Sequence, residues 1–402
     1  MFTYVENENS AKIKVIGVGG AGGNAINNMI ASNLQGVKFI CANTDAQALD
    51  ISQAESRIQL GAQITEGLGA GANPQVGRDA ALENAEMIKE ILADSHMVFI
   101  TAGFGGGTGT GAAPVIARLC KEMGILTVAV VTRPFSFEGR KRAKQADEGI
   151  LELRKSADTV ITIPNDRLRG LASKNAKMVD MFKKADEILL HSVKGITDLI
   201  MMPGLVNLDF ADVKTTMSRA GMAIMGIGLS SGENRALEAA ERAISHPLLE
   251  DINISGAKGV LMNITSNSDL TMEEMTEASE RIYNEVGDDA EIIWGAVIDD
   301  SVGEEMSVTV IATGIGETEK EIQKPMVSKI IDQNYDPTYG GKVRDITPAD
   351  LTQSPDLEQP TFIRRRQAVN ERPGNELYRE YKGIVIDNDD LDVPTFLRRK
   401  AD

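Results

Sequence analysis

Met97-Val-Phe-Ile-Thr-Ala-Gly-Phe-Gly-Gly-Gly-Thr-Gly-Thr-Gly111 is the stretch that decides the fold. Its first residues are apolar or β-forming and predict a buried strand, and residues 105–111 then contain five glycines. Residues 112–123 predict a helix, in which Pro114 suits the first turn because its missing N–H would be unpaired there anyway. A strand, a glycine loop and a helix N-terminus predict a phosphate site, since backbone N–H groups and the helix dipole face the anion.

Two further glycine-rich loops follow the same pattern. Residues 12–18 predict a strand, and Gly17-x-Gly19-x-x-Gly22 at its end matches the dinucleotide fingerprint G-x-G-x-x-G. A second strand, 37–42, ends in Asn43-Thr-Asp45, where a dinucleotide enzyme places the carboxylate that binds a ribose hydroxyl. The third loop, Gly67-Leu-Gly-Ala-Gly-Ala-Asn-Pro74, precedes a helix.

Strands and helices alternate through residues 12–165, which predicts a doubly wound α/β domain. The strand at 125–131 is continuously apolar, as in a parallel sheet covered on both faces, and the strand at 159–163 is followed closely by Asn165. Ligands of such sheets bind at the carboxyl ends of the strands, so we expect the loops to converge on one site.

A long helix and a second set of elements follow. Apolar residues recur every three or four positions between Met181 and Ile200, and Pro203-Gly204 ends this helix, which we expect to lie between two domains. In Leu205-Val-Asn-Leu-Asp-Phe-Ala-Asp212, Asp209 suits the N-cap of a further helix, with Asp212 at its third position. Residues 222–316 predict a smaller α/β domain with a mixed sheet, its strands near 223–228, 259–265, 292–298 and 306–313 and its helices near 233–245 and 272–286.

From residue 317 the composition is that of a disordered linker, without apolar periodicity. It contains a repeat, because Asp356-Leu-Glu-Gln-Pro-Thr-Phe-Ile-Arg-Arg365 and Asp390-Leu-Asp-Val-Pro-Thr-Phe-Leu-Arg-Arg399 share D-L-x-x-P-T-F-[IL]-R-R. A short peptide with an apolar centre and a basic end is typical of a motif that folds onto a partner's groove. The predicted organisation is a flexible arm (1–11), a nucleotide-binding domain (12–178), a central helix (179–202), a second domain (203–316), a disordered linker (317–389) and a partner-binding peptide (390–402).

Composition excludes several functions. The net charge of -17 over 402 residues argues against broad nucleic-acid binding, which needs a basic face. No apolar run reaches the roughly 18 residues of a membrane span and no signal pattern begins the chain, so we expect a cytoplasmic protein. Cys41 and Cys120 lie in apolar segments and are expected to be reduced core residues, and the three histidines form no metal pattern.

Two classes of nucleotide protein fit these loops. A nicotinamide or flavin oxidoreductase would explain the fingerprint and Asp45, but it needs one glycine loop for its pyrophosphate, whereas this chain has three. Several loops around one ligand suit a compact triphosphate better. A Walker A loop is absent because residues 105–110 contain no lysine, so positive charge has to come from a metal, the helix dipoles or Arg142.

Gly105-Gly-Gly-Thr-Gly-Thr-Gly111 resembles the signature loop of the tubulin superfamily. Together with residues 19–24, 43–45, 135–142 and 207–212, it closely resembles the FtsZ family of bacterial cell-division GTPases, and residues 390–399 match as well. The resemblance implies a tubulin-like α/β fold: a doubly wound GTP-binding domain, a long central helix, a smaller α/β domain and a disordered C-terminal tail. It also implies GTP or GDP with Mg²⁺ as ligands, and filaments in the division ring at mid-cell.

The resemblance further implies which residues hold the nucleotide. Those implied to contact phosphates and ribose are Gly20, Ala21, Gly22, Gly23 and Asn24, Ala70 and Gly71 at the γ-phosphate, Gly106, Gly107, Thr108 and Gly109 around the phosphate chain, and Glu138 and Arg142. Those implied to hold the base are Asn165 and Asp186 at the guanine edge and Phe182 stacked on the ring.

The acidic loop carries the implied chemistry. Asn207, Asp209 and Asp212 are implied to enter the pocket of the next subunit and polarise the attacking water, although helix capping alone also explains the two carboxylates. Head-to-tail contacts of this kind do not close and generate filaments. A nucleotide-gated scaffold that does not hydrolyse GTP is a third hypothesis.

The tail implies partners besides the chain itself. In the resembled family the terminal peptide, here residues 390–399, binds membrane-tethering and regulatory division proteins, so contact with the membrane would be indirect. The earlier copy at 356–365 departs from the single motif that we expect, and we treat it as a second docking site by hypothesis.

Overall fold

The computed structural model describes residues 11–168, 177–202, 204–206, 209–218, 221–249, 254–287 and 290–315. These residues belong to one compact unit. Asn207, residues 1–10 of the predicted arm, the predicted linker and both tail motifs lie outside the described residues.

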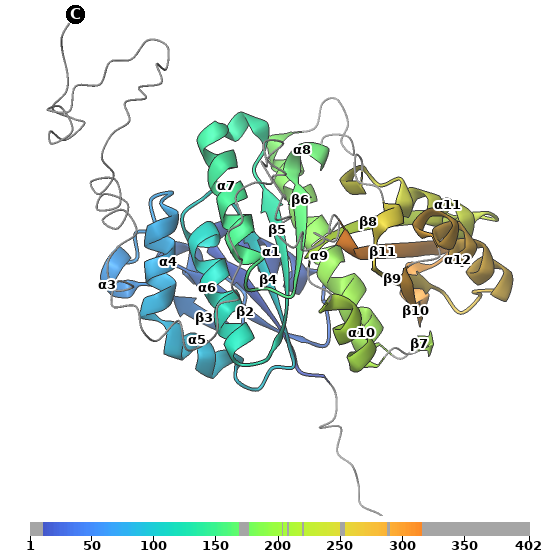
Figure 1. The fold of residues 1–402 in the computed structure, drawn as a ribbon, viewed down its shortest axis with the longest axis horizontal. Helices are drawn as coiled ribbons and strands as arrows, with labels where there is room; N and C mark the ends of the chain where they lie inside the picture. The colour runs from blue at the N-terminus through green and yellow to red at the C-terminus, as the bar shows by residue number, and fades with distance from the viewer. Residues whose placement is uncertain are drawn as a thin grey trace, which may run out of the picture. The chain divides into compact units, whose positions relative to one another are not determined.

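A single sheet of eleven strands runs through the described part of the chain, in the order β3-β2-β1-β4-β5-β6-β8-β11-β9-β10-β7 (Figure 1). The strands are β1 Ile13–Val18, β2 Val37–Asn43, β3 Ser56–Gln59, β4 Met97–Gly103, β5 Leu126–Arg133, β6 Thr159–Pro164, β7 Gly204–Val206, β8 Gly221–Ser231, β9 Gly259–Ser266, β10 Glu291–Ile298 and β11 Glu305–Ile315.

Helices cover both faces of this sheet (Figure 1). They are α1 Gly19–Ala31, α2 Ala46–Asp50, α3 Ala62–Thr65, α4 Pro74–Glu83, α5 Ala85–Leu92, α6 Thr108–Glu122, α7 Arg140–Leu153, α8 Asn165–Leu168, α9 Met178–Met201, α10 Phe210–Met217, α11 Arg235–Ile244 and α12 Met272–Val286. Short 3-10 turns occur at η1 Ser136–Glu138, η3 Pro247–Leu249, η4 Ile254–Gly256 and η5 Asp300–Val302.

Strands β1 to β6 are parallel, and their residues alternate between two cores. Val15 and Phe99 point to the core under α1, α9 and α10, whereas Ile16 and Ile100 point to the core under α4 to α7. Because both faces of the sheet are buried there, the inner strands β4 and β5 are mostly apolar, as the sequence predicts for a covered parallel sheet. All six residues of β1 are buried.

The second part of the sheet is mixed, as predicted. Strand β11 is antiparallel to β8 and β9, and β9 is parallel to β10. Helices α11 and α12 cover this part on the face opposite to α9. Residues 204–206, for which the sequence predicts no strand, form β7, which pairs antiparallel with β10.

The two predicted α/β domains share one sheet. Strand β6 pairs in parallel with β8, with Thr159 opposite Gly221. Helix α9 lies across the junction and packs on one face against β5, β9 and β10. Periodicity reveals that both β6 and β8 are strands but carries no information about their pairing. The domain limits drawn from the sequence remain a prediction.

Two predicted loops are partly helical. Helix α1 begins at Gly19 and α6 begins at Thr108, so glycines of both loops form first turns. The expectation that α6 starts at residue 112 is therefore wrong, and Pro114 lies inside the helix, where the Thr110 carbonyl loses its usual N–H donor. A glycine is needed in this turn because α4 lies so close that a Cβ on Gly111 would lie 1.9 Å from the Pro74 carbonyl oxygen.

The cysteines behave as predicted. Cys41 and Cys120 are both buried and free. Burial raises the pKa of both thiols, that of Cys120 to about 12, so neither is a thiolate at neutral pH.

Candidate functional site

A cavity of about 410 Å³ lies at the carboxyl ends of β1, β4, β5 and β6, where the sequence predicts the site. Most residues expected to hold the nucleotide line it. They are Gly20, Ala21, Gly106, Gly107, Thr108, Gly109, Glu138, Arg142, Asn165, Phe182 and Asp186. Val18, Gly19, Gly103, Phe104, Thr132, Pro134, Ala185 and Leu189 complete the wall.

Five expected residues lie outside this wall. They are Gly22, Gly23, Asn24, Ala70 and Gly71. Gly22 is a packing position, because a Cβ there would lie 2.5 Å from the Thr101 carbonyl oxygen. Ala70 is buried against the phosphate loop, since a Cβ on Gly107 would meet the Ala70 methyl at 2.8 Å.

The N-termini of α1 and α6 form the end of the cavity where the sequence predicts the phosphates. Gly20 in the first turn of α1 is exposed and has open space where a Cβ would stand. For Gly106, in the loop before α6, the Arg142 guanidinium is the one group of the described residues within 4 Å of such a Cβ. Backbone N–H groups at the starts of two helices can therefore approach an anion without steric hindrance.

Arg142 is the one cation among the described residues that line the cavity. Its Nη1 donates to Glu138 Oε2 at 2.6 Å, and Glu138 Oε1 accepts from the Phe135 N–H at 2.9 Å. The carboxylate thus holds the guanidinium against the turn that precedes α7, and a bound anion would share the charge of Arg142 with Glu138.

Asn165 supplies an unsatisfied acceptor at the other end. Its side chain is 5% exposed, and its buried Oδ1 has no hydrogen-bond partner among the described residues. A buried acceptor without a donor costs about 1–3 kcal/mol, a cost that a ligand N–H would remove. This oxygen therefore points to a polar ligand edge.

Asp186 and Phe182 flank the same end from α9. Burial, and then the neighbouring Glu187, raise the pKa of Asp186 to about 6, so its carboxylate is an acceptor at neutral pH. Phe182 is 42% exposed and packs edge-on against Phe135, with ring centroids 5.4 Å apart. An exposed ring beside two acceptors suits a flat base with N–H groups on its edge.

Asp166 was not singled out from the sequence, although it follows Asn165 directly. Its two carboxylate oxygens accept from the Ser136 N–H at 3.1 Å, and Oδ1 also accepts from the Ser136 hydroxyl at 3.2 Å. It ties the turn that carries Glu138 to the segment that carries Asn165. The rule that sites lie at strand carboxyl ends would have indicated this residue.

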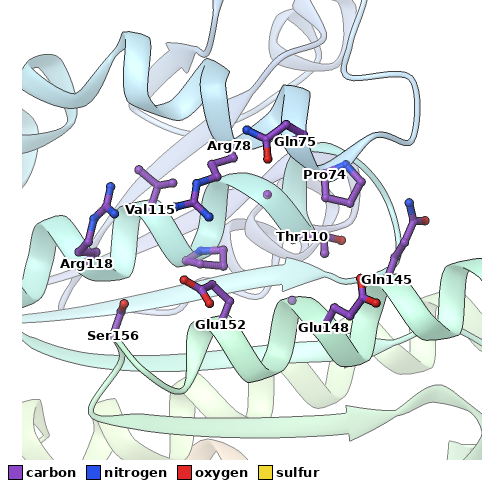
Figure 2. Close-up of a pocket in the computed structure, with 13 residues that line it drawn as sticks. Pro74, Gln75, Arg78, Thr110, Val115, Arg118, Gln145, Glu148, Glu152 and Ser156 are labelled. Carbon is purple, nitrogen blue, oxygen red and sulfur yellow. The ribbon is translucent and has the colours of Figure 1, made fainter. Parts of the chain in front are cut away.

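A second cavity of about 240 Å³ lies between α4, α6 and α7, and Figure 2 shows its polar walls. None of the predicted site residues lines it. Arg78 and Arg118 come from α4 and α6, and Glu148 and Glu152 come from α7 (Figure 2). Gln145 Nε2 in the same wall donates to the Ala72 carbonyl at 3.3 Å and so tethers the 67–73 loop to α7, which no sequence signal indicated.

The acidic loop lies at the opposite ends of the strands from the cavity. Asp209 caps α10 by accepting from the Asp212 N–H at 2.9 Å, as predicted, and both side chains are exposed. Thr159, the first residue of β6, donates to the last carbonyl of α10, and the His96 ring before β4 lies 6.1 Å from the Phe210 ring. Helix α10 therefore sits at the amino ends of strands whose carboxyl ends form the cavity (Figure 1).

The described residues contain no group of three His, Cys, Asp or Glu side chains that could hold a metal ion. Glu138 and Asp186 are the acidic residues of the described cavity wall, and Glu138 is already paired. A Mg²⁺ ion at such a site would be held mainly by phosphate oxygens of a ligand and by water, which is its usual mode of binding.

Family models match most of the described chain. The model described as "Tubulin/FtsZ family, GTPase domain" matches residues 12–173, and "FtsZ family, C-terminal domain" matches residues 221–316.

Relatives match over the full length. The chain is 51% identical to "Cell division protein FtsZ" of Pseudomonas putida and 50% identical to that of Azotobacter vinelandii, and each alignment covers the whole of both chains. The solved structure "FtsZ dimer, empty (M. jannaschii)" is 46% identical with a TM-score of 0.74, over 77% of this chain and 89% of that one. These matches confirm the predicted tubulin-like fold class.

Proposed function

Because the chain belongs to the FtsZ family of tubulin-like GTPases, we propose that its nucleotide cavity is half of an active site, which the acidic loop of a second copy completes. The chain is a GTP-binding GTPase that forms filaments in cell division. The oxidoreductase alternative has no support in these matches, and Asp45, its expected ribose ligand, instead caps α2 by accepting from the Gln47 and Ala48 N–H groups. The GTPase assignment also argues against the third hypothesis, a scaffold that binds GTP without hydrolysing it.

The proposal rests on the distance between the nucleotide cavity and the acidic loop at the start of α10. The cavity lies at the carboxyl ends of β4 and β6, whereas α10 packs at their amino ends. A strand of six or seven residues is about 20 Å long, so Asp209 and Asp212 are out of reach of a nucleotide in the same chain. A second copy stacked head to tail brings the two edges together.

The base end of the cavity suits guanine. Guanine has N–H donors on its Watson–Crick edge, and the Asn165 Oδ1 and the Asp186 carboxylate are acceptors. Phe182 offers its exposed ring for stacking. Adenine presents a ring nitrogen acceptor where guanine has N1–H, so a carboxylate at this edge favours guanine.

The N-termini of α1 and α6 and the Arg142 guanidinium line the cavity, where we propose that they face the triphosphate. Ala70 and Gly71 are proposed to meet the γ-phosphate from the adjoining loop, and Gly22, Gly23 and Asn24 to support the first turn of α1. Mg²⁺, carried by the phosphates, would neutralise charge that develops on them during transfer.

The water-positioning groups come from the acidic loop. Asp209 Oδ1 is used by the helix cap, which leaves Oδ2 without a described partner, and the Asp212 carboxylate is exposed. We assign Asp209 and Asp212, with Asn207, the task of orienting and polarising the attacking water across the interface.

The test is the dependence of the hydrolysis rate on protein concentration. A site completed by a second copy predicts almost no phosphate release below a threshold concentration, and a steep rise above it that coincides with light scattering. GDP and ATP serve as controls that support no scattering. A rate that rises linearly from the lowest concentrations would show that each chain hydrolyses GTP alone.

Localisation and partners extend the proposal. In the part of the chain that the structure describes, no helix has the length and hydropathy of a membrane span. We propose that the filaments form the division ring at mid-cell in the cytoplasm. Residues 390–399 would bind membrane-tethering and regulatory division proteins, and residues 356–365 would be a second docking site.

Deleting residues 356–366 is expected to weaken the capture of a bivalent partner. Two copies of one motif raise the local concentration of the second after the first has bound, so avidity falls when one is removed. Partner affinity is measured with filaments of the full chain and of the deletion. A deletion of residues 325–335, outside both motifs, is the length-matched control. Equal partner affinity in both deletions would contradict the hypothesis that residues 356–365 are a second docking site.

A further inference from the structure

Thr44 belongs to the Asn43-Thr-Asp45 triplet at the end of β2, which the assigned function has so far left unused. The Thr44 side chain is 0% exposed. Asp45, the residue of the triplet that the dinucleotide pattern singles out, turns away to cap α2. Thr44 is therefore the member of the triplet whose side chain reaches the start of α6.

Thr44 contacts the start of α6 and the loop that precedes α4. Its Oγ1 lies 2.6 Å from Thr108 Oγ1, at the start of α6. Its carbonyl accepts from the Gly69 N–H at 3.3 Å and from the Thr65 hydroxyl at 3.2 Å. One buried residue thus joins the start of α6, which lines the nucleotide cavity, to the loop that precedes α4.

The direction of the hydroxyl pair follows from burial. Either threonine could be the donor, but the Thr44 hydroxyl has no other hydrogen-bond partner in the described part of the chain. If Thr108 donated, the Thr44 hydrogen would be buried without an acceptor, at a cost of about 1–3 kcal/mol. Thr44 therefore donates to Thr108. The Thr108 hydrogen is left for the cavity, which the half-buried Thr108 lines.

We propose that Thr44 is a positioning residue that directs the Thr108 hydroxyl to donate to a phosphate oxygen of the bound nucleotide. This inference rests on the proposed function, because it assumes that the cavity holds the triphosphate. A hydrogen bond from a fixed hydroxyl to an anion gains strength from its charge, whereas a freely rotating hydroxyl has to be ordered on binding. Thr44 removes that ordering cost before the nucleotide arrives.

Thr44→Val deletes the hydroxyl and keeps the branched shape, and we expect it to weaken GTP binding about tenfold. Thr44→Ser retains the donor and is expected to restore affinity. Thr101→Val is the matched control, because Thr101 lies buried on β4 and its hydroxyl has no partner among the described residues, so GTP affinity should not change. Equilibrium titration with GTP gives the dissociation constants, and circular dichroism checks the fold.

A double variant separates positioning from a general structural effect. If Thr44 acts through the Thr108 hydroxyl, Thr44→Val has no further effect once Thr108→Val is present. Losses that multiply in the double variant, or unchanged affinity in Thr44→Val alone, would overturn the proposal. Wild-type protein that bound no GTP would contradict the proposed function instead, so the two failures are distinguishable.

Discussion

Asp212→Ala is expected to abolish GTP hydrolysis while it leaves GTP affinity unchanged. The carboxylate is exposed at the third position of α10, at the sheet edge opposite the cavity, so its loss removes nothing that holds the nucleotide in the same chain. Removing one preorganised polar group from a transition state typically lowers kcat about 100- to 1000-fold. Phosphate release and equilibrium GTP titration measure the two quantities separately.

Asp209 needs a different substitution because it has two tasks. Asp209→Ala would also delete the helix cap, which is worth about 1 kcal/mol. Asp209→Asn keeps an oxygen for the Asp212 N–H and removes only the charge, so a loss of kcat in this variant would report on catalysis. Glu122→Ala is the matched control, since Glu122 is an exposed acid of α6 whose one described partner is Arg118. It should hydrolyse GTP like the wild type.

Mixing two inactive variants tests whether two chains form one active site. Asp212→Ala chains still bind GTP, and Asp186→Ala chains should bind it poorly but carry an intact acidic loop. Joint filaments contain interfaces in which the nucleotide of the first chain meets the loop of the second. Hydrolysis should recover on mixing two variants that are each inactive. Equal loss of GTP binding and hydrolysis in Asp212→Ala would instead make Asp212 a structural residue.

The sequence could predict most of the cavity because strand ends and glycine loops are local patterns. The apolar runs at β1 and β4 show where strands stop, and in a parallel sheet those ends meet at one edge. The roles of Asn165, Phe182 and Asp186 came from the family resemblance, since a lone Asn or Phe carries no such signal. The structure adds two observations: the buried Asn165 Oδ1 has no partner among the described residues, and the pKa of Asp186 is raised.

The sequence could not predict relations between distant segments. The pairing of β6 with β8, the bond between Thr44 and Thr108, and the tether from Gln145 to Ala72 each join residues far apart along the chain. Local propensity even pointed the wrong way for the glycine loops, because glycine disfavours helices, yet α1 and α6 start within them. Some of their glycines allow two helices to pack closely, and others leave space for a phosphate to approach the backbone. A sequence pattern does not distinguish these two roles.

Gly111→Ala is expected to lower stability through helix packing, whereas Gly20→Ala is expected to lower GTP affinity. A methyl group at residue 111 would lie 1.9 Å from the Pro74 carbonyl oxygen and 2.6 Å from the Arg78 nitrogen, both backbone atoms of α4. The helices would have to move apart, at a cost of about 3 kcal/mol or more. That change corresponds to a fall in Tm of at least about 5 °C.

Gly20 lies in the first turn of α1, and no atom of the described residues lies within 4 Å of the position that a methyl group would take there. Gly20→Ala should melt at the wild-type temperature or slightly above it, because alanine favours helices by about 1 kcal/mol. Its methyl group would instead occupy the space through which a phosphate approaches the helix N-terminus, so GTP affinity should fall sharply. Melting curves without nucleotide and GTP titrations of both variants provide the test. A stable Gly111→Ala would mean that α4 and α6 can separate at little cost, and normal GTP binding by Gly20→Ala would remove Gly20 from the phosphate site.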